Sequence, residues 1–190
     1  MKIGLFFGSF NPFHLGHKVI ASYMSEFTDL EQVWLVVSPQ NPEKKKSTLL
    51  EEHHRLMIIR QEVEDNSKLM ASDIEFKLPQ PNYTINTLTY LKEQFPDKFF
   101  CLIMGSDNLE NFHKWKNYEQ ILNQHDIYVY PRKGFNMLTT KHKNIHIVEG
   151  VPEIQISASF IRNKIKLKKD ISYMIPEKSW KYIDEMNFYK

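Results

Sequence analysis

Strand-length apolar runs alternate with segments of helical period along this chain, and no other feature restricts its possible folds as strongly. The expected strands are Ile3–Phe7, Val33–Val37, Met70–Phe76, Phe99–Met104, Ile127–Tyr130 and His146–Val148. The expected helices are Leu15–Phe27, Leu49–Val63, Thr84–Phe95 and Pro176–Met186, with Pro176 at a first helical position. This alternation predicts an α/β fold, a doubly wound parallel sheet with helices on both faces.

The charge balance and the single cysteine exclude several classes of protein. The 190 residues include 25 Lys or Arg and 23 Asp or Glu, a net charge of +2, so we expect no nucleic-acid partner. Cys101 lies in an apolar run and cannot form an internal disulfide, which indicates a reduced, cytoplasmic setting. We expect no membrane association, because no apolar run is long enough to span a bilayer and Ile3–Phe7 is too short for an export signal.

A turn rich in Gly and Pro, Gly8–His17, joins the first expected strand to the first expected helix. A helix N-terminus offers unpaired N–H groups and partial positive charge, which attract phosphate. His14 and His17 are three residues apart, so both imidazoles can face one anion. Zinc is the alternative ligand, but no third Cys, Asp or Glu stands close by, so we expect no metal bound by the protein here.

Two loops follow expected strands, where ligands bind in open parallel sheets. Residues 38–47 contain two prolines and three consecutive lysines, Lys44 to Lys46, which could bind phosphate or form a solvated surface. Pro79–Asn82 precedes Tyr83. Arg132, between a strand and Gly134, could reach a nucleotide or lie on the surface.

The ordered motifs resemble those of the nucleotidyltransferases with a Gly-x-Phe-x-Pro-x-His-x-Gly-His pattern, and within them the bacterial nicotinate-nucleotide adenylyltransferases. The resemblance covers nearly the whole chain. Its motifs are the Gly8–His17 turn, Ser72–Glu75, Asn82–Leu88, Met104–Asp107 with Trp115, and Ile156–Arg162.

The resemblance implies one Rossmann-like nucleotidyltransferase domain over residues 1–190, with a small helical C-terminal part. It implies transfer of AMP from ATP to nicotinate mononucleotide, which yields deamido-NAD and pyrophosphate, with Mg²⁺ accompanying ATP. This chemistry needs no protein nucleophile, because the attacking phosphate is already an anion, and the sequence offers no obvious Ser-His-Asp set.

The resemblance also implies roles for particular residues. The implied catalytic residues, which hold the phosphates, are His14, His17, Lys44, Ser157 and Arg162. The implied ATP-binding residues are Gly8, Ser9, Phe10, Gly105, Asp107, Arg132 and Ser159. The implied nicotinate-nucleotide pocket contains Tyr83, Thr84, Trp115 and Lys116. The chain departs from the family pattern at several positions, among them Asn11, where many members have Asp, and Ala158, where many have Ser.

Three rival functions stay open at this point. Phosphopantetheine adenylyltransferases usually carry Thr where this chain has His14, and they lack the Tyr83-Thr84 and Trp115 elements. Adenylation of nicotinamide mononucleotide is the second rival, because this substrate carries an amide where nicotinate mononucleotide carries a carboxylate. A nucleotide-binding regulator would bind ATP without turnover.

Overall fold

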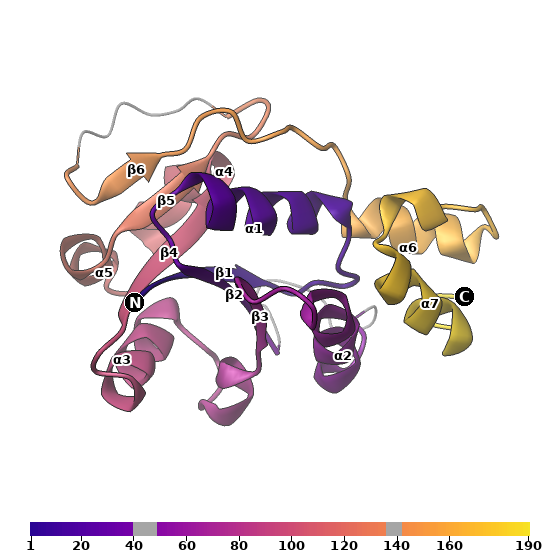
Figure 1. Cartoon of the computed structure of the whole chain (residues 1–190), viewed down its shortest axis with the longest axis horizontal. Helices are drawn as coiled ribbons and strands as arrows, with labels where there is room; N and C mark the ends of the chain where they lie inside the picture. Colours follow the sequence, from indigo (N-terminus) through magenta and orange to yellow (C-terminus); the bar gives the residue numbers. More distant parts are fainter. Residues whose placement is uncertain (40–48, 136–141) are drawn as a thin grey trace.

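The computed structural model describes residues 1–39, 49–135 and 142–190. Within these ranges, six parallel strands form one sheet in the order β3-β2-β1-β4-β5-β6 (Figure 1). The strands are β1 (Lys2–Gly8), β2 (Gln32–Val37), β3 (Leu69–Ser72), β4 (Phe99–Gly105), β5 (Ile127–Tyr130) and β6 (Ile145–Ile147). The order reverses between β1 and β4, so the carboxyl ends of these two strands border the crevice where such sheets bind ligands. The predicted doubly wound parallel sheet is confirmed.

Helices cover both faces of the sheet. Leu5 of β1 packs in one apolar cluster with α3 (Thr84–Gln94), α4 (Ser106–Asn111) and α5 (Tyr118–Gln124). The next residue, Phe6, belongs to a second cluster with α1 (Leu15–Phe27) and α2 (Glu52–Val63). Successive side chains of a strand point to opposite faces, and both faces are covered here, which explains the nearly unbroken apolar runs in β1 and β4.

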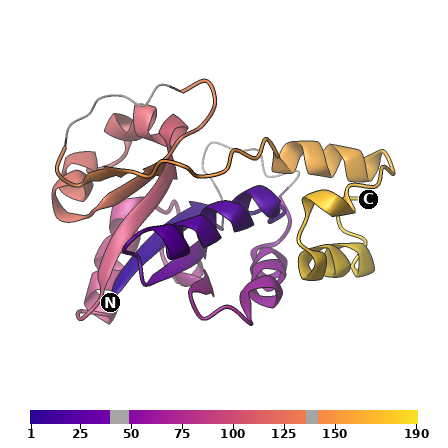
Figure 2. The ribbon, with the colours of Figure 1, turned by 45° about the horizontal axis from the view of Figure 1, so that its top comes forward.

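A small helical part follows the sheet. It contains α6 (Ala158–Lys166), the 3₁₀ helix η4 (Ser172–Met174) and α7 (Glu177–Glu185), which lie together beside α2 (Figure 2). The buried Ser179 hydroxyl of α7 donates to the Ile58 carbonyl of α2 at 3.2 Å. Ile161 and Ile183 bury their side chains in the same cluster as α1 and α2. The predicted helical C-terminal part is therefore present and packs onto the sheet domain.

Several predicted element boundaries are wrong. The strand expected over Met70–Phe76 ends at Ser72, and Ile74–Lys77 forms the 3₁₀ helix η2, in which Glu75 is buried. Helix α2 begins at Glu52 and not at Leu49. Pro176 is the N-cap of α7 and not its first helical residue. The sequence analysis missed α4, α5 and η3 (Phe112–Lys114), which are too short to show a helical repeat.

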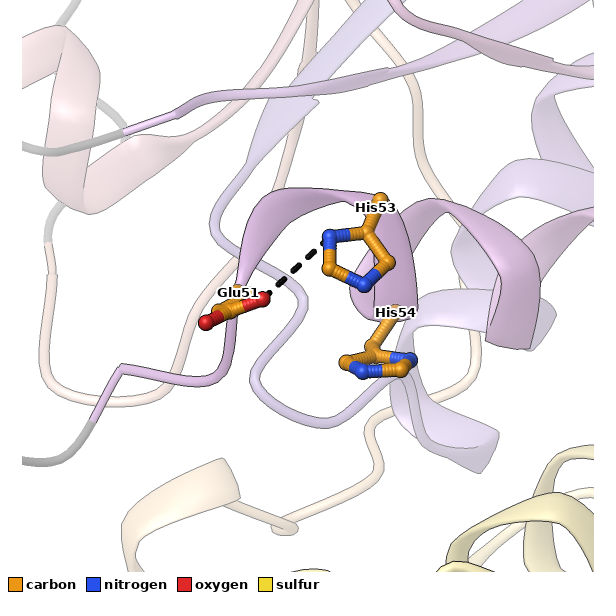
Figure 3. A group of neighbouring side chains, drawn as sticks. All are labelled: Glu51, His53 and His54. Carbon is orange, nitrogen blue, oxygen red and sulfur yellow. Dashed lines mark ion pairs between the residues drawn. The ribbon is translucent and has the colours of Figure 1, made fainter.

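The start of α2 gathers three side chains that could hold a metal ion, Glu51, His53 and His54 (Figure 3). His53 Nδ1 lies 3.5 Å from a carboxylate oxygen of Glu51, and both side chains are mostly exposed. His54 Nδ1 lies 2.9 Å from the Tyr182 hydroxyl, which ties α2 to α7.

No helix in the described ranges is long and apolar enough to cross a bilayer.

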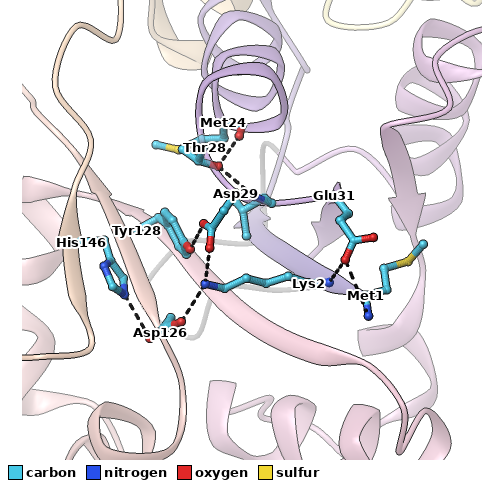
Figure 4. A network of polar contacts seen from close by, with 10 residues as sticks. Met1, Lys2, Met24, Thr28, Asp29, Glu31, Asp126, Tyr128 and His146 are labelled. Atoms are coloured by element: carbon cyan, nitrogen blue, oxygen red, sulfur yellow. Dashed lines mark hydrogen bonds and ion pairs between the residues drawn. The ribbon is translucent and has the colours of Figure 1, made fainter.

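A polar network ties β1 to its neighbours at the amino ends of the strands (Figure 4). Lys2 Nζ lies 2.8 Å from Asp29 and 2.9 Å from Asp126, and Asp29 also accepts from the Tyr128 hydroxyl. Burial would lower the pKa of Lys2, but its hydrogen bonds to Asp29, Tyr128 and Asp126 raise that pKa overall. Burial likewise opposes ionisation of both carboxyls, yet Lys2 and Tyr128 hold the pKa of Asp29 below the usual value, and His146 and Lys2 do the same for Asp126.

Replacing Lys2 by Met removes the cation from this network. We expect Lys2→Met to lower the free energy of unfolding at pH 7 by about 1 kcal/mol, a small value because the ion pairs are partly solvated. Carboxyls with a depressed folded pKa stabilise the fold above their unfolded value of about 4, and that contribution is lost as the pH falls through the folded value. Urea unfolding of both proteins at pH 7 and pH 3 should show a smaller difference at pH 3. An equal difference at both pH values would contradict this account.

Candidate functional site

One buried cation, the guanidinium of Arg55, holds the Gly8–His17 turn in place. Arg55 of α2 is 0% exposed, and its guanidinium donates to the carbonyls of Ser9 at 2.6 Å, Ser38 at 2.7 Å, Pro39 at 2.8 Å and Leu50 at 2.8 Å. The loops after β1 and β2 are thereby joined. The sequence analysis missed Arg55, because an arginine in an amphipathic helix is usually exposed and nothing in the sequence shows four loop carbonyls converging on it.

The interior of the turn is aromatic. Phe10 and Phe13 are buried, and their rings pack against His17 with centroids 5.0 Å and 5.7 Å from the imidazole. Gly8 leaves room for the Phe10 ring, because a Cβ at this position would lie 2.8 Å from it. The side chain of Phe10, expected at ATP, is therefore part of the buried interior of the turn and lines neither described cavity.

The imidazole rings of the two histidines are stacked face to face. The rings of His14, the N-cap of α1, and His17 are 3.7 Å apart with an interplanar angle of 21°. His17 Nδ1 accepts from the His14 N–H at 3.3 Å, so a neutral His17 ring bears its hydrogen on Nε2. His14 is buried, which together with the Arg132 charge lowers the pKa of His14 to about 4. Its Nδ1 has no hydrogen-bond partner. The two rings therefore lie together, as their spacing predicted, and their role as phosphate ligands stays a prediction.

Two cavities open beside these rings, with volumes of about 640 Å³ and 560 Å³, in the size range of ligand sites. The first cavity is lined by Gly8, Ser9, Tyr83, Thr84, Asp107, Trp115 and Lys116, among others. The second is lined by His14, Gly16, Ser157, Phe160 and residues 151–156, among others. Both cavities share His17, Tyr130 and Arg132. Two ligands bound in the two cavities would therefore meet at these three side chains.

Arg132 forms part of the wall between the cavities. Its guanidinium lies 5.7 Å from the Tyr130 ring centroid, and its Nε lies 3.6 Å from Asp107 Oδ1. The Arg132 N–H donates to the Ser106 hydroxyl at 2.9 Å, which fixes the chain after β5 against the start of α4. Gly105, where β4 meets α4, leaves room for the Asp107 carboxylate, which a Cβ at this position would displace. The Arg132 cation consequently faces both cavities.

The first cavity brings together the four side chains expected to bind a nicotinate nucleotide. Tyr83 is the N-cap of α3, and Thr84 is its first residue. Lys116 Nζ lies 4.4 Å from the Tyr83 ring centroid, in cation–π contact, and Trp115 packs on Phe112. The first cavity therefore offers two aromatic side chains and a cation to one ligand.

Glu75 lines the first cavity. The sequence analysis named it only as the end of the Ser72–Glu75 motif and gave it no role of its own. Its carboxylate accepts from the Thr87 hydroxyl of α3 at 3.0 Å, and its carbonyl accepts from the Asn82 amide at 2.8 Å. Burial raises the pKa of Glu75, while hydrogen bonds from Ser38, Thr87 and Asn82 oppose that shift. Glu75 thus fixes the loop before Tyr83 to α3.

The start of α6 borders the second cavity. Ser157 is the N-cap, and its hydroxyl accepts from the Phe160 N–H at 3.2 Å. Ser159 is exposed, and Arg162 donates to the Asn11 carbonyl at 2.6 Å, so Arg162 binds the turn itself. Among the described residues expected to bind ATP or its phosphates, Phe10, Gly105, Ser159 and Arg162 line neither cavity. Lys44, with Lys45 and Lys46, lies outside the described residues.

Comparisons with known proteins give the family. A family model described as cytidylyltransferase-like matches residues 5–164. A protein of Flavobacterium psychrophilum named "Probable nicotinate-nucleotide adenylyltransferase" is 56% identical over 193 residues, which cover 100% of both chains. A protein of Bacteroides thetaiotaomicron with the same name is 40% identical over 97% of this chain and 92% of its own length.

The fold is similar to that of solved structures. The Plasmodium falciparum nicotinic acid mononucleotide adenylyltransferase complexed with NaAD has a TM-score of 0.82 and 21% identity, covering 99% of this chain and 97% of its own. A second structure of that enzyme, complexed with APC, has a TM-score of 0.80. The chain therefore belongs to the cytidylyltransferase-like family and, within it, to the nicotinate-nucleotide adenylyltransferases.

Proposed function

We propose that this chain transfers AMP from ATP to nicotinate mononucleotide, with one substrate in each cavity and the phosphates meeting at His17 and Arg132. The observation that supports this most directly is the wall of His17, Tyr130 and Arg132 shared by the two cavities. Full-length relatives of 40 to 56% identity are named for this activity.

The reaction requires alignment more than a protein nucleophile. An oxygen of the mononucleotide 5′-phosphate forms a bond to the α-phosphorus of ATP, and the bond from that phosphorus to the bridging oxygen of the β-phosphate breaks. Pyrophosphate leaves with the electron pair, and deamido-NAD results. Holding both phosphates in line can supply about 7 to 11 kcal/mol of the barrier. The fixed shape of the Gly8–His17 turn serves this purpose, since Arg55 and the aromatic rings hold it from two sides.

Nicotinate mononucleotide belongs in the first cavity. Tyr83 and Trp115 offer aromatic faces for the pyridine ring, and Lys116 offers a cation for its carboxylate. Thr84 adds an N–H at the start of α3, where partial positive charge favours an anion.

ATP belongs in the second cavity, where Ser157 and the start of α6 face His14 and His17. His17 Nε2–H and Arg132 donate to the transferring phosphate, and such preorganised donors are typically worth about 10² to 10³ in rate. Arg162 and Ser159 act from the border of this cavity, with Arg162 working through the Asn11 carbonyl. A lysine of the 44–46 run is proposed as a further phosphate ligand.

Magnesium is proposed to enter with ATP. The Asp107 Oδ1 atom is buried and has no hydrogen-bond partner, and a carboxylate oxygen is the donor type that Mg²⁺ prefers. Asp107 lines the first cavity beside Arg132, which both cavities share, so it fits as one direct or water-mediated ligand at the point where the phosphates meet. When bound, the ion would neutralise charge on the phosphates.

The buried free thiol of Cys101 is compatible with the proposed cytoplasmic setting.

Substrate identity is tested by pyrophosphate release in the presence of ATP and Mg²⁺. We expect turnover with nicotinate mononucleotide and slower turnover with nicotinamide mononucleotide, because Lys116 would face an amide in place of a carboxylate. Phosphopantetheine should give none. Turnover with phosphopantetheine alone would overturn the substrate assignment, and ATP binding without any release would favour a regulator.

His17→Ala removes the imidazole shared by both cavities. We expect kcat to fall by about 10² or more while the circular-dichroism spectrum is unchanged, since the lost contact acts on the transferring phosphate. His113→Ala is the matched control, because His113 is exposed in η3 and lines neither described cavity. Near-normal turnover of His17→Ala would remove the central role assigned to this residue.

The imidazole of His14 should titrate near pH 4 in the free protein, because burial and the Arg132 charge disfavour its cation. Bound triphosphate would favour the cation and raise this pKa. Nuclear magnetic resonance of ¹⁵N-histidine protein, with His14→Gln to assign the resonance, measures both states. A value near 6.5 in the free protein, or no change on addition of a non-hydrolysable ATP analogue, would argue against His14 as a phosphate ligand.

A further inference from the structure

The residues that follow α7 turn back toward the Gly8–His17 turn. Asn187 and Tyr189 adopt the left-handed conformation, with φ of 55° and 65°, which is uncommon for residues other than glycine. These two bends bring the Tyr189 side chain inward, and its hydroxyl donates to Asn11 Oδ1 at 2.7 Å. A segment 178 residues away in the sequence thus reaches the centre of the turn.

Asn11 is 4% exposed and receives hydrogen bonds from three separate segments. Its side-chain oxygen accepts from the Tyr189 hydroxyl and from the Leu50 N–H at 3.2 Å. Its carbonyl accepts from Arg162 of α6 at 2.6 Å. Asn11 precedes His14 by three residues and belongs to the turn that carries both imidazoles.

The charges of two guanidinium groups act on the Tyr189 hydroxyl. Burial raises the pKa of Tyr189, and the charges of Arg162 and Arg55 act in the opposite direction. The hydroxyl therefore stays protonated at neutral pH and remains a donor to Asn11. Arg55 in turn holds the Ser9 carbonyl, two residues before Asn11.

We propose that Tyr189 is a positioning residue for the transfer reaction, which acts through Asn11 to hold His14 and His17 in line with the phosphates. This proposal rests on the proposed adenylyl transfer. Tyr189 lines neither described cavity and touches no substrate there, so its hydroxyl contributes to turnover through the geometry of the turn.

Tyr189→Phe tests the proposal, because it keeps the ring and removes only the hydroxyl. We expect kcat to fall about fivefold to tenfold, as for the loss of one well-placed hydrogen bond, with KM for nicotinate mononucleotide unchanged. Tyr182→Phe is the matched control. Tyr182 lies on α7, and its hydroxyl contacts His54 and not the turn, so its kcat should equal that of the unmodified chain.

A double-mutant cycle with Asn11→Ala separates positioning from general loosening of the fold. If Tyr189 acts through Asn11, Tyr189→Phe should have almost no further effect on kcat once Asn11 is Ala. Thermal unfolding of all variants measures any structural loss. Equal kcat for Tyr189→Phe and Tyr182→Phe, or fully additive effects in the cycle, would overturn the proposal. Failure of the proposed function is distinguishable, because the unmodified chain would then release no pyrophosphate.

Discussion

One buried guanidinium organises the catalytic end of this molecule. The Arg55 guanidinium is buried away from water and donates hydrogen bonds to the carbonyls of Ser9, Ser38, Pro39 and Leu50. Burial lowers the pKa of Arg55, yet a guanidinium starts so far above neutrality that it stays charged. A buried charge is tolerated when its hydrogen bonds are satisfied, and removal of one partner is then costly. Ser9 in the turn after β1 and residues 38–39 just after β2 are consequently held together before any substrate arrives.

That rigidity suits a reaction in which the reactants supply the nucleophile and the leaving group. The crevice between β1 and β4 follows from the strand order, and the aromatic interior of the turn follows from Phe10 and Phe13. What remains is to bring two anions together, and the shared wall of His17, Tyr130 and Arg132 provides donors and a cation at that point. A neutral His14 stacked on His17 avoids placing two like charges 3.7 Å apart.

The sequence allowed prediction of those parts that depend on local pattern. Apolar runs predicted β1, β2, β4 and β5, and the ordered motifs predicted that Tyr83, Thr84, Trp115 and Lys116 share one pocket. Features that depend on distant partners were not predictable. The clamp of Arg55 needs two loops and the start of α2 to converge, and the 3₁₀ turn at Glu75 depends on Thr87 of another helix. Arg162 was expected at the triphosphate, but its observed contact with Asn11 spans 151 positions of sequence.

The Lys2 network lies at the amino ends of the strands, whereas the cavities lie at the carboxyl ends. A sheet of parallel strands separates the two ends by the length of β1, so substitutions around Asp29 and Asp126 can alter heat tolerance with little influence on chemistry. Substitutions that raise stability can therefore be placed at one end of the molecule while the other end keeps its geometry, which gives the engineering of a more heat-tolerant enzyme a defined starting point.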